Sequence, residues 1–463
     1  MTMRDLDRRS DDTPGEIDEI ARGEHFYQRL LDDEVREVPV SLRATSAGFA
    51  EPMDLAPSRY FDPAFHQLEV EHVWSHVWQM ACREEQIAEV GACVVYEVAD
   101  WSLIVVRTAP DTIRAFHNSC LHRGTQLRTS PGRVKNFRCP YHGFTWSLDG
   151  TLEVIPAAWD FPHVDRDEFS LPEAQVGTWG GFVFVNVDPN AAPFEDYLED
   201  LPWHFERWPL EDRYLAAHVV RVMPCNWKVA LEAFIEAYHT MAVHPQLLPT
   251  AADSLSEYDV YGPHVSRMIT AVGVSSEHLD RQLDEVEVVR AMLGSRDAEV
   301  TIEPGATARQ VLGDRVRASL RKRTGRDYAE VTDAELLDGI EYFLFPNFMP
   351  WAGFLTSFAY RFRPDGHDPD SCVIDIMVLE PVPDGEARPP AASTRHIGPG
   401  ESWADVAELG VFGRVFNQDG STFGRVQRGL RASVKASTTL ARYQESRIRH
   451  FHSTLDQYLA RHD

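Results

Sequence analysis

The order of apolar and polar positions predicts two separate sets of β-strands. Short runs rich in Val, Ile, Phe and Tyr, bounded by turn-forming residues, are typical of strands. A first set lies in the first half of the chain, at Cys93–Val98, Ser102–Val106, Ile113–Phe116 and Phe137–Cys139. A second set, expected to form one antiparallel sheet, lies at Glu341–Pro350, Phe358–Arg363 and Val373–Leu379.

Other segments repeat their apolar residues at helical intervals. Val70–Trp78 and Arg442–His452 show this period, and Ser276–Leu337 is charged and helical in character. A further helix is predicted from Leu231 to His239. Because strands and helices occupy different stretches of the chain, the predicted fold class is α+β.

Composition narrows the class of protein. The 463 residues, 43% of them hydrophobic, allow two or three domains with ordinary cores. No apolar run approaches the roughly eighteen residues that a membrane span needs. The charged segment from Met1 to Gly48 lacks the apolar stretch of a secretory signal, so a cytoplasmic protein is expected.

The formal net charge of −27 opposes binding to nucleic acid or anionic lipid. Such a surface can attract a basic patch on a reductase or a ferredoxin, although solubility is the simpler explanation. Four cysteines are scattered singly, which indicates reduced core thiols rather than disulfides. They are Cys82, Cys93, Cys225 and Cys372.

The other two cysteines belong to two short pairs, each with one thiol and one imidazole. The pairs are Cys120-x-His122 and Cys139-x-x-His142, followed by Gly124 and Gly143. Two thiolates and two neutral imidazoles are the ligand set of a Rieske 2Fe–2S cluster. A Cys2His2 zinc site is the alternative, but zinc fingers usually place both cysteines before both histidines. The pairs therefore predict a Rieske cluster held on two hairpin tips.

The motif CLHRG…CPYHG resembles the Rieske domain of Rieske-type non-haem iron oxygenases, and Trp179–Asn186 is similar to the strand that closes that domain. The resemblance covers about residues 55 to 460 and identifies the chain with the large catalytic (alpha) subunit. It implies a charged extension at 1–55, an all-β Rieske domain with a preceding helix at 56–189, and a catalytic domain at 190–463. The catalytic domain is expected to have a helix-grip (START-like) fold, an antiparallel sheet around a long helix.

A mononuclear Fe(II) site needs two imidazoles and a carboxylate. On a straight helix Glu232, Glu236 and His239 share one face, whereas His244 lies about 140° from His239. The helix must therefore distort or break for both histidines to bind one ion, and Pro245 favours a break.

Spacing does not select the carboxylate ligand. Resemblance points to Asp419, which in the family opens a helix that ends near Gln427-Arg-Gly429. The alternatives are that Asp419-Gly420 is only a turn, with Asp405 or Glu408 as weaker substitutes. Four other histidines are not expected to be ligands: His72 and His76, in a helix, and His450 and His452, expected at a surface or interface.

The resemblance also implies an activity. Electrons from a separate NAD(P)H-dependent reductase, with or without a ferredoxin, enter at the cluster and pass to the mononuclear Fe(II), where O2 is used to hydroxylate a small-molecule substrate. Family members are commonly trimers, with or without a small beta subunit. Glu236 is expected to join a cluster histidine of one subunit to His239 of the next.

Two other functions remain open. One is a pure Rieske electron carrier, for which His239, His244 and Asp419 would be coincidental. The other is a monooxygenase or N-demethylase of quaternary amines such as carnitine or betaine, because Glu236 stands where most ring hydroxylases carry Asp. A mostly apolar set of expected pocket residues favours an aromatic or cyclic substrate. This set is Phe234, Met241, Leu247, Phe343, Phe345, Met349, Phe354 and Phe358.

Overall fold

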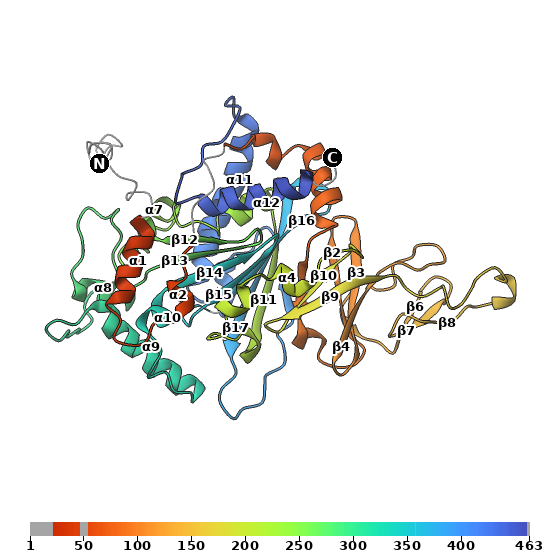
Figure 1. The fold of residues 1–463 in the computed structure, drawn as a ribbon, viewed down its shortest axis with the longest axis horizontal. Coiled ribbons are helices and arrows are strands. Elements are labelled where there is room, and N and C mark those ends of the chain that lie inside the picture. Colours follow the sequence, from red (N-terminus) through yellow and green to blue (C-terminus); the bar gives the residue numbers. More distant parts are fainter. Residues whose placement is uncertain (1–21, 47–53, 357, 461–463) are drawn as a thin grey trace.

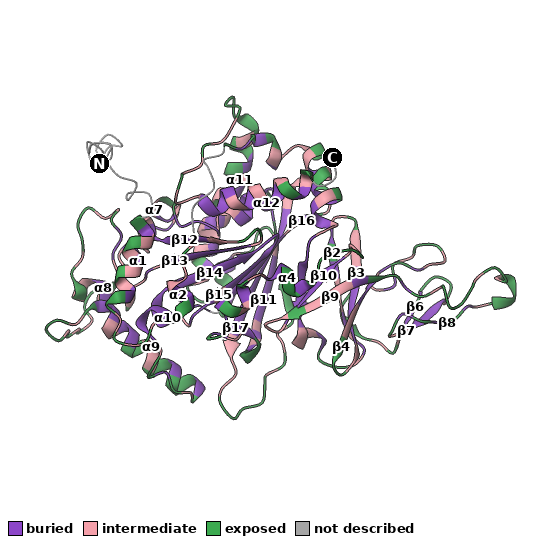
Figure 2. Ribbon diagram, viewed as in Figure 1, coloured by how far each residue is buried: buried purple, intermediate pink, exposed green. Residues whose placement is uncertain are grey.

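The computed structural model describes residues 22–46, 54–356 and 358–460, which form two lobes (Figure 1). The smaller lobe, drawn in orange and yellow, extends to one side. The larger lobe contains a long sheet with the C-terminal helices beside it. Figure 2 shows that the strands of the large sheet are mostly buried, while exposed residues gather on loops and outer helices. No helix among the described residues is long and apolar enough to cross a membrane.

The smaller lobe is all-β, as predicted. A seven-stranded sheet has the order β1-β10-β9-β4-β3-β2-β5, and β6, β7 and β8 form a three-stranded sheet. The bounds are β1 Gln79–Arg83, β2 Ala92–Val98, β3 Trp101–Ala109, β4 Thr112–His117, β5 Gly132–Arg133, β6 Asn136–Arg138, β7 Thr145–Ser147, β8 Leu152–Val154, β9 Glu173–Trp179 and β10 Phe182–Asn186.

The strand predicted at Trp179–Asn186 is present as β10, but it begins only at Phe182. β9 ends at Trp179 and β10 begins at Phe182, and these two residues pair across the turn. Gly180 and Gly181 both have positive φ, +59° and +74°, as a two-residue hairpin turn requires. The apolar run therefore continues through a reversal that its hydrophobic pattern does not reveal.

The larger lobe is built on an eight-stranded sheet with the order β12-β13-β14-β15-β16-β17-β11-β18. The bounds are β11 Arg213–Met223, β12 Glu257–Tyr261, β13 Val265–Thr270, β14 Gly339–Leu344, β15 Phe348–Ala352, β16 Phe358–Asp365, β17 Asp368–Pro381 and β18 Thr394–His396. All neighbours pair antiparallel except β11 and β18, which pair parallel. The predicted strand Glu341–Pro350 is divided between β14 and β15 by a turn at residues 345–347.

Two long helices of the C-terminal segment pack on this sheet. Phe416 of α11 contacts Phe358, and Phe451 of α12 contacts Phe343. The α-helices are α1 Arg22–Asp32, α2 Val40–Arg43, α3 Pro63–Glu69, α4 Phe194–Tyr197, α5 Leu201–His204, α6 Trp227–Glu232, α7 Thr240–Val243, α8 Glu285–Met292, α9 Ala308–Thr324, α10 Asp333–Leu337, α11 Phe412–Ala432 and α12 Ser446–Ala460.

The predicted helical segments are confirmed with changes. Ser276–Leu337 contains α8, α9 and α10, and the helix predicted at Arg442–His452 begins at Ser446 and continues to Ala460. Only residues 70–74 of the helix predicted at Val70–Trp78 are helical, as a π-helical turn after α3.

Part of the charged N-terminal extension packs on the larger lobe. The hydroxyl of Tyr27 in α1 donates to Asp338 (3.1 Å), and buried Arg267 donates to the backbone carbonyl of Ser41 in α2 (2.6 Å). Residues 1–21 and 47–53 of this extension lie outside the described part of the chain.

Candidate metal centres

Two loops of equal geometry carry the predicted Rieske ligands. In the first, the Gly124 N–H donates to the carbonyl of Cys120 (2.8 Å). In the second, the Gly143 N–H donates to the carbonyl of Cys139 (3.1 Å). Both glycines have positive φ, +76° and +81°, which glycine adopts without steric cost. Both loops therefore allow the backbone to approach a bound cluster closely.

The loops bring the four side chains together. The rings of His122 and His142 have centroids 4.7 Å apart, and Cys120 and Cys139 are almost fully buried. His122 stacks on Phe144 at 4.8 Å, and its buried Nδ1 has no hydrogen-bond partner among the described residues. An unpartnered imidazole nitrogen beside two buried thiols is a suitable donor set for a 2Fe–2S cluster. Burial raises the pKa of the Cys120 thiol.

The helix predicted to run to His239 is interrupted. Asn226 caps α6 by accepting from the Lys228 N–H (3.1 Å), but the helix ends at Glu232. The prediction that Glu232, Glu236 and His239 share one face of a helix is therefore wrong. Glu232 instead contacts Tyr60 (2.9 Å) and His452 (2.7 Å). His452 is fully buried, so its predicted place at a surface or interface is also wrong.

The break predicted between the two histidines lies elsewhere: the helix is interrupted between α6 and His239, and one helical turn, α7, joins the two histidines and ends at His244, just before Pro245. His239 is the N-cap and His244 the C-cap of the four-residue α7, which turns both imidazoles toward Asp419. His244 Nε2 lies 2.7 Å and His239 Nε2 3.6 Å from Asp419 Oδ1. One ligand atom from each of the three residues lies within 4.8 Å of the others. This set fits a two-histidine, one-carboxylate Fe(II) site.

Asp419 has a different local setting from the expected one. It lies in the eighth position of α11, so the predictions that it opens a helix or forms a turn are both wrong. Helix α11 buries it at 6% exposure. Asp405 and Glu408 are exposed and do not line this site.

The charges of this site favour a cation. Burial alone would lower the pKa of His239, but hydrogen bonds to Asp419 and Glu236 and the charges of these carboxylates outweigh it and raise the pKa to about 10. Burial opposes the ionised form of Asp419, yet His239 and His244 lower the pKa of its carboxyl group. Two carboxylates around two imidazoles thus form an electrostatic trap for a positive ion.

Each imidazole is oriented from its outer nitrogen. Nδ1 of His239 donates to Glu236 (2.6 Å), which also accepts from the His239 backbone N–H (3.0 Å). Nδ1 of His244 donates to the amide oxygen of Gln418 (3.0 Å). Gln418 was not predicted, and its position next to Asp419 is the one signal that the sequence offers. These contacts leave both Nε2 atoms facing the carboxylate.

A cavity of about 280 Å³ adjoins the three residues. It is lined mainly by aliphatic and aromatic side chains, among them Phe234, Leu247, Met268, Met292, Trp351, Leu355, Tyr360, Phe412 and Phe416. Of the eight predicted pocket residues, only Phe234 and Leu247 line it. Met241 and Phe354 line other cavities, and Phe343, Phe345, Met349 and Phe358 belong to the core.

One buried acid also lines the cavity. Glu341 is 1% exposed, and burial raises the pKa of its carboxyl group to about 7, against the opposing charge of Arg447 at 3.3 Å. Among the described lining residues none is Lys or Arg. The cavity therefore offers a negative or neutral wall to a substrate.

Comparison with protein families supports both halves of this description. Residues 77–165 match the model of the Rieske [2Fe-2S] domain, and residues 194–461 match that of the ring hydroxylating alpha subunit (catalytic domain). The first match favours a Rieske cluster over the zinc alternative at the four cysteine and histidine ligands.

Individual relatives have different substrates in their names. The carnitine monooxygenase oxygenase subunit of Escherichia coli (strain K12) is 34% identical over 193 residues, 41% of this chain and 52% of that protein. The chlorobenzene dioxygenase subunit alpha of Cupriavidus sp. (strain PS12) is 31% identical over 225 residues, 46% of this chain and 50% of that protein. The chain spans about half the length of the curated relatives it matches.

Solved structures share the fold. A quaternary ammonium Rieske monooxygenase in complex with L-carnitine has a TM-score of 0.61 at 19% identity, over 88% of this chain and 95% of that chain. Naphthalene 1,2-dioxygenase with indole bound in the active site has a TM-score of 0.63 at 19% identity, over 88% and 92%. Because the catalytic-domain model matches more than half of its length, this chain belongs to the ring-hydroxylating alpha subunit family, with a Rieske domain before the catalytic domain.

Proposed function

We propose that this chain is the oxygenase component of an O2-dependent system that hydroxylates a neutral, mainly apolar aromatic or cyclic compound. Electrons from a separate NAD(P)H-dependent reductase, with or without a ferredoxin, enter at a 2Fe–2S cluster held by Cys120, His122, Cys139 and His142. The observation that carries this proposal is the apolar cavity whose wall contains His239, His244 and Asp419. A pure electron carrier would have no use for such a cavity.

His239, His244 and Asp419 would hold Fe(II), which when bound supplies the oxygen chemistry. The surrounding residues orient the ligands and the substrate. Glu236 and Gln418 fix the two imidazoles through Nδ1, as outer carboxylates and amides do at many metal sites. Phe234, Tyr360 and Phe416 present ring faces and edges to a flat substrate and exclude water from the reacting carbon.

The charge of the cavity bears on the substrate. Carnitine and betaine each carry a carboxylate, which would need a cationic partner once desolvated. The described lining residues include no Lys or Arg, and the ionised form of Glu341 would repel an anion. A neutral ring compound needs no cationic partner and is not repelled by Glu341, and the aromatic lining can pack against its faces.

An amine without a carboxylate is the second candidate. Trp351 and Tyr360 beside buried Glu341 resemble a cage for a quaternary ammonium group. Relatives named as carnitine and glycine betaine monooxygenases support this class of substrate. In this case the reaction is N-demethylation rather than ring hydroxylation.

Glu341→Gln distinguishes the two candidates. If the substrate is a cationic amine, removing the charge should weaken its binding about 10-fold, or roughly 1.4 kcal/mol. A neutral ring substrate should keep its affinity. We would measure substrate-dependent O2 uptake and analyse products across aromatic hydrocarbons, terpenoids, aromatic acids and quaternary amines. Glu408→Gln, at an exposed position, is the control. Coupled turnover of an amine alone, with release of an aldehyde, would overturn the ring-hydroxylation proposal.

A trimer completes the proposed electron path. Glu236 is 9% exposed and holds His239 from the side away from Asp419. A cluster histidine of a neighbouring subunit, His122 or His142, would contact this carboxylate directly or through water. Sedimentation analysis of the purified subunit tests the assembly, with or without a small beta subunit.

A further inference from the structure

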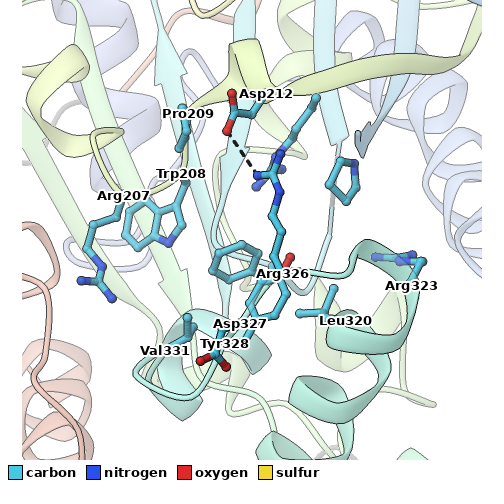
Figure 3. Close-up of a pocket in the computed structure, with 13 residues that line it drawn as sticks. Arg207, Trp208, Pro209, Asp212, Leu320, Arg323, Arg326, Asp327, Tyr328 and Val331 are labelled. Atoms are coloured by element: carbon cyan, nitrogen blue, oxygen red, sulfur yellow. Dashed lines mark hydrogen bonds and ion pairs between the residues drawn. The ribbon is translucent and has the colours of Figure 1, made fainter. Parts of the chain in front are cut away.

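A second cavity, of about 200 Å³, shares a loop with the metal cavity (Figure 3). In the segment after β15, Phe354 lines the second cavity, whereas Leu355 and Thr356 line the metal cavity. The rest of the second cavity comes from the start of β11 and the segment before it, from the end of β17, and from the end of α9 and the residues after it. Trp208, Leu320 and Tyr328 are among these residues.

Arg213 lines this second cavity and is 5% exposed. Its Nη2 donates to the carbonyl of Gly353 (2.6 Å), but its buried Nη1 has no hydrogen-bond partner among the described residues. No carboxylate of the described chain forms an ion pair with it. Glu380 and Asp212 stabilise its charge only from a distance, because each forms its ion pair with another arginine. A group that binds at Nη1 and supplies a negative charge would therefore stabilise the buried guanidinium further.

The neighbouring arginines differ from Arg213 because each has a carboxylate partner. Arg207 pairs with Glu335 (2.9 Å), Arg323 with Glu380 (3.3 Å) and Arg326 with Asp212 (3.2 Å). Figure 3 shows the last of these pairs as a dashed line. The cavity is thus positively charged at Arg213.

Besides these charged residues and the exposed acid Asp327, the walls are apolar. The rings of Tyr328 and Phe354 meet edge to face at 5.3 Å, and Trp208, Leu320 and Val331 complete the lining. A ligand that satisfies both parts of this surface has one anionic group and a small apolar body. An aromatic or short aliphatic carboxylate has this form, and inorganic phosphate has only the charge.

We propose that the second cavity binds a small carboxylate with an apolar body, its carboxylate held by Arg213 and its body against Trp208, Tyr328 and Phe354. The site is distinct from the cavity at His239, His244 and Asp419. Arg213 also holds Gly353, which lies two residues from both Trp351 and Leu355 of the metal cavity. Binding at Arg213 therefore changes affinity for substrate at the metal cavity, and substrate changes carboxylate affinity by the same factor.

Calorimetric titration of the intact metal-loaded subunit with benzoate, butyrate and inorganic phosphate tests this site. We expect saturable binding of benzoate, weaker binding of butyrate and none of phosphate at the same concentration. Arg213→Gln should weaken benzoate binding at least 10-fold. Val331→Trp should do the same by filling the cavity while it leaves Arg213 in place. Arg315→Gln removes an exposed charge from α9 outside the cavity and is the matched control.

The visible spectrum of the cluster and the melting temperature show that each variant is folded. If Val331→Trp and Arg213→Gln fold and bind benzoate as the unsubstituted protein does, benzoate occupies another place and the proposal is overturned. Equal binding of phosphate would overturn the requirement for an apolar body. If Arg213→Gln does not fold, Val331→Trp alone decides between these outcomes.

Discussion

The two candidate metal centres are constructed in opposite ways. The Rieske ligands come from two short loops of the same form, supported by a small core of their own that includes Phe137, Phe144 and Trp146. The ligands of the second centre come from the two ends of α7 and from α11, which is distant from α7 in sequence. They line a cavity whose opposite wall includes strands of the large sheet. Local turn geometry specifies the first centre, whereas the second exists only when α11 packs against the α6–α7 region.

Because the two centres are built independently, we expect that a substitution can remove the iron of one centre and leave the other in place. The unsubstituted subunit, purified without oxygen, should contain about three irons per chain. Cys139→Ser should reduce this to about one, remove the Rieske EPR signal and abolish turnover. Cys93→Ala, in the same small core but outside the loops, should retain all three. Tightly bound zinc in the unsubstituted protein at Cys120 and Cys139 would contradict the cluster.

Loss of the second centre should leave the first intact. Asp419→Ala should remove about one iron per chain and all product, because two neutral imidazoles hold Fe(II) weakly, while the visible spectrum of the cluster stays unchanged. Asp405→Ala, which removes an exposed carboxylate from the segment before α11, is the control and should behave as the unsubstituted protein. Retention of iron and turnover by Asp419→Ala would place the carboxylate ligand elsewhere.

Communication between the centres is a smaller and more selective effect. Glu236→Gln should bind both metals but deliver the electron of a pre-reduced cluster about 100-fold more slowly, since the Nδ1 hydrogen bond of His239 loses its carboxylate. Rapid-quench single-turnover yield and rate measure this. Glu408→Gln, exposed on the surface, is the matched control. An unchanged rate would show that the electron takes another path.

The smallest expected effect concerns the packing behind the second centre. Burial raises the pKa of Glu232 to about 8 from an ordinary value of 4.5, while Tyr60 and Lys228 act in the opposite direction. Between these values the folded chain binds a proton that the unfolded chain has released, so the free energy of unfolding falls as pH rises from about 4.5 to about 8.

Glu232→Gln should remove that part of the pH dependence. The difference in unfolding free energy between variant and unsubstituted protein should change by about 3 kcal/mol between pH 5 and pH 8, measured by urea unfolding. Burial keeps the neighbouring His452 neutral in this range by lowering the pKa of its imidazole. Parallel pH profiles for the two proteins would show that Glu232 is ionised when folded.

Sequence alone predicted what depends on neighbouring residues. The strands β2, β3 and β4 follow from short apolar runs, and the two cysteine loops follow from ligand spacing and a glycine that tolerates positive φ. The end of the helix at His244 followed from Pro245, whereas the interruption itself lies before His239 and not between the two histidines. Asp419 came from the resemblance to a family, since spacing selected no carboxylate.

Only the tertiary structure decided the rest. Helical periodicity placed Glu232 beside His239, yet α6 ends at Glu232, and the side chain turns to Tyr60 and His452. Six of the eight expected pocket residues face other parts of the protein, because an apolar side chain gains as much from the core as from a cavity wall. Burial free energy has no direction, so it shows that a phenylalanine is inside but not which space it lines.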